Sequence, residues 1–161
     1  MKFIDRTFNS NHKHACEIWK YIREKDNGVT NFHFEIAADI LTEEELSILE
    51  GMRPGLVQLE IGIQTTNPQT LQEINRRMDL ETVRKRVERI RERGNVHQHL
   101  DLIAGLPEED YSSFQNSFNW VYHLQPDQLQ LGFLKVLKGS PLWEKADQYG
   151  IIYDEQPPYE G

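Results

Sequence analysis

Residues 57–64 read Val57-Gln-Leu-Glu-Ile-Gly-Ile-Gln64, and polar and apolar side chains alternate along the whole stretch. Alternation with a period of two is typical of a β-strand with one face buried and the other accessible. A strand covered on both faces, as in a doubly wound α/β sheet, would be apolar throughout. The stretch therefore predicts a sheet that helices cover on one face only.

Four further stretches read as strands, and helical segments separate them. The five predicted strands are residues 2–5, 31–37, 56–63, 96–103 and 128–137. The predicted helices are residues 14–25, 42–51, 68–93 with a break near Asp79, 110–124 and 141–149. Strands that alternate with helices predict parallel strands joined by right-handed crossovers.

The predicted fold is α/β: a parallel, curved sheet of about five strands with helices on one face, forming part of a TIM-like partial barrel. This domain takes up residues 1–150, and residues 151–161 form an extended tail. A closed TIM barrel fits less well, because its interior is filled with branched apolar side chains and it needs about 250 residues. Both edge strands of such an arc would be exposed. We therefore expect that a further segment precedes Met1 in a parent protein.

Composition narrows the classes of function. The 161 residues carry 18 Lys and Arg against 26 Asp and Glu, for a formal charge of −8. A surface of this sign repels nucleic acids and anionic membranes, so neither is an expected partner. Mean hydropathy is −0.66, and no segment reads as a membrane span or a signal peptide. The single cysteine gives no sign of an oxidising compartment, so we expect a cytoplasmic protein.

Polar residues gather toward the carboxyl ends of three successive predicted strands. Glu35, Glu60, Gln64 and Asp101 all fall on the polar side of the alternation. Parallel α/β proteins place their ligands at these strand ends, so the pattern favours a binding site over a merely solvated face. Gly62 and the Gly105-Leu-Pro107 turn lie beside these positions, where glycine lets a ligand approach the backbone, although the turn by itself is also common in proteins without a site.

Metal-ligand types occur in two places, without the pattern of a metal centre. His97 and His99 share a strand face, and His12, His14 and Cys16 lie close together in sequence. A metal site needs three or four converging ligands, and neither group has an obvious complement, so no metal ligands are predicted. Arginines of the segment 76–93 alternate with glutamates, which is typical of a solvated helix face. Arg76 is set apart as a candidate, because it lies near the end of the loop-and-helix segment that follows Gln64.

Five segments resemble the radical SAM superfamily, in particular its cobalamin-dependent, magnesium-protoporphyrin IX monomethyl ester cyclase-like branch, and more distantly oxygen-independent coproporphyrinogen oxidase. They are residues 3–8, 34–36, 60–67 (Glu-Ile-Gly-Ile-Gln-Thr-Thr-Asn), 74–76 and 101–107 (Asp-Leu-Ile-Ala-Gly-Leu-Pro). The resemblance implies that Glu35, Gln64, Arg76 and Asp101 contact S-adenosylmethionine. Glu60 and the backbone of residues 134–136 are weaker correspondences.

One departure from the family governs activity. The family binds its iron-sulfur cluster through a Cys-x3-Cys-x2-Cys loop, and this sequence has one cysteine. The resemblance therefore implies a fragment of a radical SAM oxidoreductase or methyltransferase that is inactive alone. The iron-sulfur cluster, and cobalamin if the parent uses it, would be held by upstream segments, and the substrate would be a small molecule.

The residues alone also allow two other classes of function. A hydrolase without a cofactor could use Glu35 and Asp101 as an acid and base pair, provided that one carboxyl has a raised pKa. Alternatively, the polar face meets a partner domain, and the chain is a binding or scaffold module.

Overall fold

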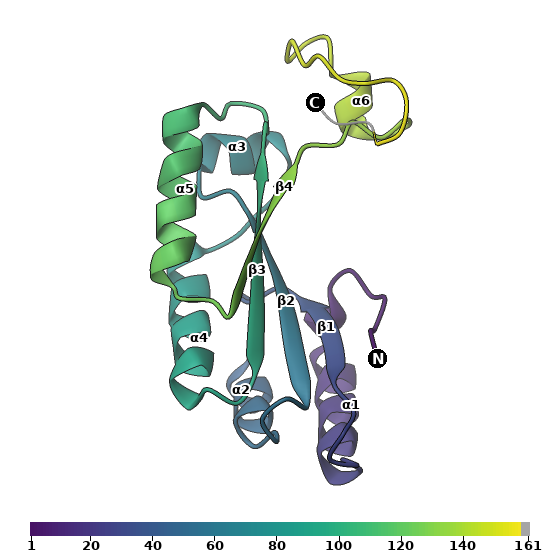
Figure 1. Ribbon diagram of the computed structural model, residues 1–161, viewed down its shortest axis with the longest axis vertical. Coiled ribbons are helices and arrows are strands. Elements are labelled where there is room, and N and C mark those ends of the chain that lie inside the picture. The colour runs from purple at the N-terminus through teal and green to yellow at the C-terminus, as the bar shows by residue number, and fades with distance from the viewer. Residues whose placement is uncertain (159–161) are drawn as a thin grey trace.

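The alternating stretches form one four-stranded parallel sheet in the computed structural model, which describes residues 1–158. The strands are β1 (Phe32–Ile36), β2 (Val57–Gln64), β3 (His97–Ala104) and β4 (Gln128–Phe133), and they lie in sequence order β1-β2-β3-β4. Every neighbouring pair is parallel, which confirms the predicted fold class. Figure 1 shows the strands side by side.

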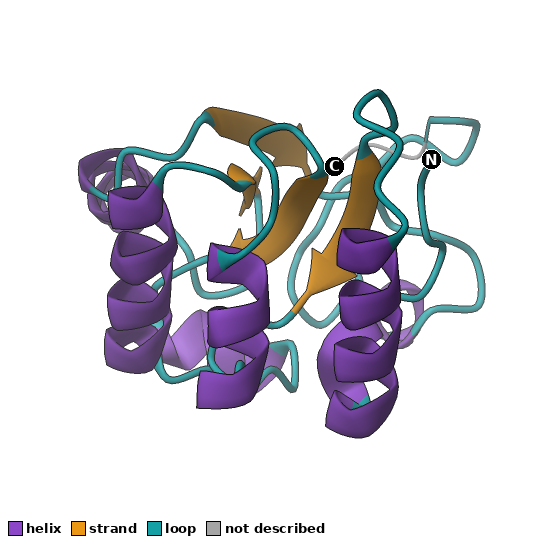
Figure 2. Cartoon of the chain, turned by 90° about the horizontal axis from the view of Figure 1, so that it is seen from below, coloured by secondary structure: helices purple, strands orange, loops and turns teal. Residues whose placement is uncertain are grey.

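Helices precede, connect and follow the strands. They are η1 (Phe8–Ser10), α1 (His12–Glu24), α2 (Glu43–Glu50), α3 (Pro68–Glu73), α4 (Leu80–Arg93), α5 (Tyr111–His123) and α6 (Pro141–Glu144). Figure 2 shows the long helices together on one side of the sheet. Among the described residues, no helix is long and apolar enough to cross a membrane.

Local sequence signals set several helix ends. Thr42 and Glu45 form a capping box at the start of α2. Asn67 accepts a hydrogen bond from Gln69 N at the start of α3, and Pro68 follows at the first helical position. Gly94 ends α4 in the left-handed conformation, with a φ of +69°. Asp79 caps α4, so the predicted break in the segment 68–93 is confirmed and separates α3 from α4.

The core lies between the helices and one face of the sheet. The apolar residues of β2 are fully buried, whereas its polar residues are partly accessible. Trp19 of α1 packs edge-on against Phe34 of β1, with ring centroids 5.8 Å apart, and both side chains are inaccessible to solvent. Burial on one face alone confirms the one-sided alternation, and it leaves the polar face open for a site.

The first predicted strand is wrong. Residues 2–5 contribute only an isolated parallel bridge between Lys2 and His33, so the sheet has four strands rather than five. The chain then turns into η1, where the Asn9 side chain bonds both backbone groups of Ala37, at 2.9 and 3.0 Å. A side chain thus takes the hydrogen bonds that a longer edge strand would have made.

Two predictions near the C-terminus were too long. The last strand ends at Phe133, because its partner β3 ends at Ala104 and Gly105 turns away with a φ of +88°. Helix α6 ends at Glu144, and turns replace the predicted helix up to residue 149. Of the predicted tail 151–161, residues 151–158 are described and contain no strand or helix, whereas residues 159–161 lie outside the described residues.

Candidate functional site

The polar face brings together side chains from all four strands. Register pairs Glu35 with Glu60, Glu60 with His99, and Gly62 with Asp101. Paired residues on one face of a sheet lie within reach of each other, at about 5 Å between Cβ atoms. A pocket of about 240 Å³ opens over these positions. Its lining is Lys2, Glu35, Glu60, Ile61, Gly62, His99, Asp101 and Gln130.

Gly62 is the point on which three of the predicted site residues converge. A Cβ atom at this position would lie 3.1 Å from Gln64 Nε2, 3.2 Å from Arg76 Nη2 and 3.4 Å from Asp101 Oδ1. Such distances are tighter than ordinary contacts, so a side chain at position 62 would push these groups aside. The glycine therefore leaves room for the three polar groups around its own backbone.

Gln64 ends β2 in a strained backbone conformation. Its φ is +68°, and the pairing with β3 shifts register between Gly62 and Gln64. Thr65 N donates to Ile63 O at 2.9 Å, so Gln64 is the central residue of a γ-turn with positive φ. This rare turn bends the chain sharply at the carboxyl edge of the sheet.

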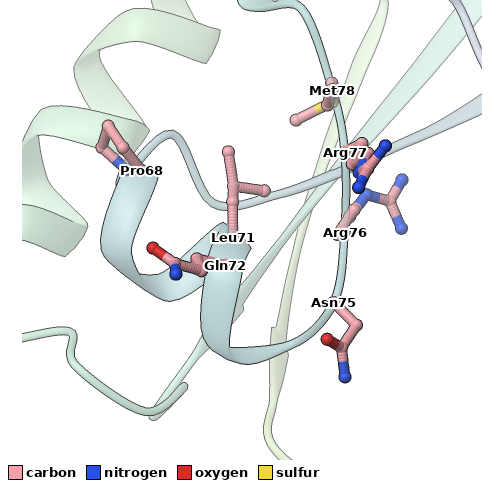
Figure 3. Close-up of a pocket in the computed structure, with 7 residues that line it drawn as sticks. All are labelled: Pro68, Leu71, Gln72, Asn75, Arg76, Arg77 and Met78. Atoms are coloured by element: carbon pink, nitrogen blue, oxygen red, sulfur yellow. The ribbon is translucent and has the colours of Figure 1, made fainter.

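Arg76 reaches the site from outside the sheet. It follows α3, where its backbone N donates to Leu71 O at 2.8 Å. Its guanidinium donates to the backbone oxygen of Gly62. Figure 3 shows Arg76 in the extended connection after α3, beside a pocket of about 630 Å³. The lining of this pocket is Pro68, Leu71, Gln72, Asn75, Arg76, Arg77 and Met78.

Asp101 carries the most unusual carboxyl group of the site. Among the described residues, no group forms a hydrogen bond with its buried Oδ1. Burial raises the pKa of the Asp101 carboxyl, and the nearby Arg76 guanidinium opposes that shift. A buried acceptor without a partner is costly, and it is the kind of group that a ligand satisfies.

Glu35 and Glu60 form a second group, toward the β1 edge. Glu60 Oε2 accepts a hydrogen bond from Lys2 Nζ at 2.6 Å, and its Oε1 lies 3.7 Å from His33 Nδ1. The Glu35 side chain is exposed. The five predicted residues thus fall into a cluster of Gln64, Arg76 and Asp101 and a pair of Glu35 and Glu60, and the 240 Å³ pocket touches both.

Sequence reasoning missed three residues of this face: Lys2, His99 and Gln130. Alternation could have identified His99 and Gln130, because both lie on the polar face with Asp101. His99 precedes Asp101 by two residues on β3, and Gln130 is its partner on β4. Lys2 gave no signal, because its contact with Glu60 spans 58 residues of chain.

The remaining metal-ligand residues do not converge. In the part of the chain that is described, no three His, Cys, Asp or Glu residues are grouped so as to hold a metal ion. Cys16 is buried in α1, and burial raises the pKa of its thiol.

A third cavity, of about 430 Å³, has Gln64 of the cluster in its lining. Leu106, Pro107, Leu134 and Leu142 give it an apolar wall. Tyr149 donates a hydrogen bond to Glu73 Oε2 at 2.7 Å across its rim. The cluster therefore contributes Asp101 to the polar pocket of 240 Å³ and Gln64 to this more apolar one.

A curved parallel sheet that helices cover on one face defines an α/β domain of the partial-barrel class, with polar groups converging at the carboxyl edge of the sheet. The chain belongs to the radical SAM superfamily, whose sequence model matches residues 5–121.

Relatives of known name agree with this assignment. The chain is 33% identical over 107 residues to oxygen-independent coproporphyrinogen III oxidase of Salmonella typhimurium, a match that covers 63% of this chain and 23% of that protein. The same enzyme of Escherichia coli is 31% identical over 127 residues, covering 75% of this chain and 26% of its own. The chain thus spans about a quarter of the length of these relatives.

Solved structures share the fold. The radical S-adenosylmethionine methyltransferase TsrM from Kitasatospora setae, solved with cobalamin and a [4Fe-4S] cluster, superposes with a TM-score of 0.75 at 18% identity, over 91% of this chain and 30% of that one. Coproporphyrinogen III oxidase from Escherichia coli superposes with a TM-score of 0.66 at 23% identity, over 93% of this chain and 34% of that one.

Proposed function

We propose that this chain is the part of a radical SAM enzyme that holds S-adenosylmethionine, with Glu35, Gln64, Arg76 and Asp101 as its contacts and Glu60 in a supporting role. The observation that carries the proposal is the convergence of Gln64, Arg76 and Asp101 on the backbone of Gly62.

The polar groups of the cluster fit the chemistry of this cofactor. The buried Asp101 Oδ1 is an acceptor that a ribose hydroxyl or an amino group would satisfy. Arg76 carries a guanidinium suited to a carboxylate, which it binds through charge-assisted hydrogen bonds. Glu35 adds a carboxylate that complements the amino group. These residues would bind and orient the cofactor, which supplies the radical chemistry when it is reduced.

The iron-sulfur cluster does not fit this chain. Three thiolates are needed, and Cys16 is the single cysteine of the sequence. The ligands of a cluster must therefore come from cysteines outside this sequence, as an upstream Cys-x3-Cys-x2-Cys loop would supply. We propose that the chain alone has no radical activity.

The finer identity of the whole protein is part of the proposal. We propose an iron-sulfur oxidoreductase or methyltransferase that acts on a small molecule in the cytoplasm, in the tetrapyrrole-cyclase-like branch. Support comes from the coproporphyrinogen oxidases among the relatives and from the fold shared with a structure solved with cobalamin. A cobalamin-binding segment would lie outside this sequence.

Equilibrium dialysis of the purified chain against radiolabelled S-adenosylmethionine tests the site. Asp101→Ala is expected to weaken binding by about 1–3 kcal/mol, the size of a lost hydrogen bond to a charged group. Glu92→Gln, which removes an exposed carboxylate from α4, is the matched control and should leave binding unchanged. If the Asp101→Ala variant and the unsubstituted chain bind S-adenosylmethionine with equal affinity, the proposal is overturned in favour of a scaffold module.

A further inference from the structure

Gln64 needs an external restraint to keep its conformation. A non-glycine residue with a φ of +68° in a γ-turn has a strained backbone. Such strain persists only where surrounding contacts over-determine the backbone. The residues that follow Gln64 are therefore the place to look for that restraint.

Thr65 and Thr66 form hydrogen bonds with side chains of another loop and another helix. Thr65 is fully buried, and its hydroxyl donates to Glu109 Oε1 at 2.6 Å. Thr66 N donates to the buried Ser117 Oγ of α5 at 2.9 Å, and the two hydroxyls lie 2.8 Å apart. Both residues after the γ-turn are thus tied to the segment that follows β3.

Glu109 is the charged member of this network. It precedes α5 and reaches the connection after β2, 44 residues away in sequence. Thr65 Oγ1 also accepts from Asn67 N at 3.0 Å, so one hydroxyl links the carboxylate to the cap of α3. Burial raises the pKa of the Glu109 carboxyl, and hydrogen bonds from Thr65 and Ser113 oppose that shift.

A role in local folding alone does not account for this placement. Asn67 already caps α3, and Asp110 accepts from Ser113 N as the cap of α5. Neither helix needs the Thr65–Glu109 contact for its start. What the contact adds is a fixed distance between the turn that carries Gln64 and the loop that follows the strand of Asp101.

We propose that Glu109 is a positioning residue for the S-adenosylmethionine site: its carboxylate anchors Thr65 and thereby fixes Gln64 beside Arg76 and Asp101. The inference rests on the proposed function, and it adds a residue that touches no part of the cluster itself. Glu109 acts through Gln64, so its removal matters only while Gln64 is present.

Two measurements on the purified chain test this role. The first is amide hydrogen exchange and ¹⁵N–¹H spectra of residues 64–67, which need no ligand. Glu109→Ala should speed exchange at Asn67 at least tenfold and shift the Gln64 side-chain amide signal. Glu109→Gln keeps an acceptor oxygen for Thr65 and should restore both. Glu92→Ala, at an exposed position of α4, is the control and should change neither signal.

The second measurement is a double-mutant cycle on the dissociation constant for S-adenosylmethionine. Glu109→Ala should weaken binding about five- to tenfold, Glu109→Gln less than threefold, and Glu109→Ala should have no further effect in a Gln64→Ala chain. Additive losses in the double variant would overturn the positioning role, as would an unchanged Gln64 signal in Glu109→Ala. Failure of the proposed function has a different signature, because the parent chain would then bind no S-adenosylmethionine while the exchange and spectral changes persisted.

Discussion

Gly62 has no Cβ atom, and this absence shapes the candidate site. Three polar groups lie where its Cβ atom would make contacts of 3.1–3.4 Å. Its backbone oxygen accepts a hydrogen bond from Arg76. A substitution there acts on the arrangement of the cluster rather than on the apolar core, because position 62 lies on the polar face.

Gly62→Ala is expected to weaken S-adenosylmethionine binding about tenfold, because the methyl group displaces the Gln64 amide or the Arg76 guanidinium. The free energy of unfolding should change by less than about 1 kcal/mol. Gly132→Ala is the control, since its Cβ would meet Leu102 O at an ordinary 3.7 Å on the same face of the sheet. Equal affinity in the two variants would contradict this account.

A second prediction concerns how the free energy of unfolding depends on pH, and it follows from the Asp101 carboxyl. Its pKa is raised from the ordinary value of 3.8, mainly by burial. The folded chain therefore binds this proton more tightly than the unfolded chain, and the associated stability is lost as pH rises through the folded-state pKa. Asp101→Asn removes this dependence, so the variant should gain stability relative to the parent chain as pH rises from 3.8.

Urea unfolding of the two proteins over a pH series measures this difference. Glu109 also has a raised pKa, but it is present in both chains and cancels. If the stability of Asp101→Asn relative to the unsubstituted chain falls with rising pH, the Arg76 guanidinium, rather than burial, dominates the pKa of Asp101.

At the scale of single residues, sequence could identify part of the site. Alternation put Glu35, Glu60, Gln64 and Asp101 on one face, and the family resemblance added Arg76. The structure brings Gln64, Arg76 and Asp101 together, and their contact with the cofactor stays a prediction. Glu109 could not be found in this way, because its contact with Thr65 spans 44 residues and depends on how two loops meet.

At the scale of elements, helix ends and interior strands were predictable because their causes are local. Thr42 with Glu45, and Asp79 as a cap, are readable from neighbouring residues. The edges of the sheet were not, because a strand exists only where a partner supplies backbone groups. Next to β1, the Asn9 side chain rather than a strand bonds the backbone of Ala37. Next to β4, the partner strand β3 ends where Gly105 turns the chain away.

A prediction at this scale concerns Asn95, which joins the end of α4 to the end of α2. Its buried side chain, after α4, donates to Leu49 O at 2.9 Å and to Met52 O at 2.8 Å, at the end of α2. Asn95→Ala leaves both carbonyls without this donor and should lower the free energy of unfolding by about 1–3 kcal/mol. Asn116→Ala, at an exposed position of α5, should stay within about 0.5 kcal/mol of the parent chain. Chemical denaturation compares the two, and equal losses would contradict the assigned role.

At the scale of the whole molecule, the sheet is an arc whose polar face carries the candidate site. Its parallel order and its one-sided cover followed from the alternation, whereas the number of strands did not. One cysteine in 161 residues limits what the arc can do alone. Anaerobic reconstitution with iron and sulfide should therefore leave the purified chain colourless and without stoichiometric iron. Bound iron in stoichiometric amount, by metal and sulfide assay, would contradict the proposed division of the cofactors.

The most direct test of the central claim is an NMR titration of the ¹⁵N-labelled chain with S-adenosylmethionine. The proposed site predicts the largest signal changes at Gly62, Gln64, Arg76 and Asp101, with the Glu92→Gln chain behaving identically. The same titration of Asp101→Ala should show these changes only at much higher concentration. Signal changes confined to the helical side of the sheet, or none at all at saturating cofactor, would contradict the assignment of the polar face as the S-adenosylmethionine site.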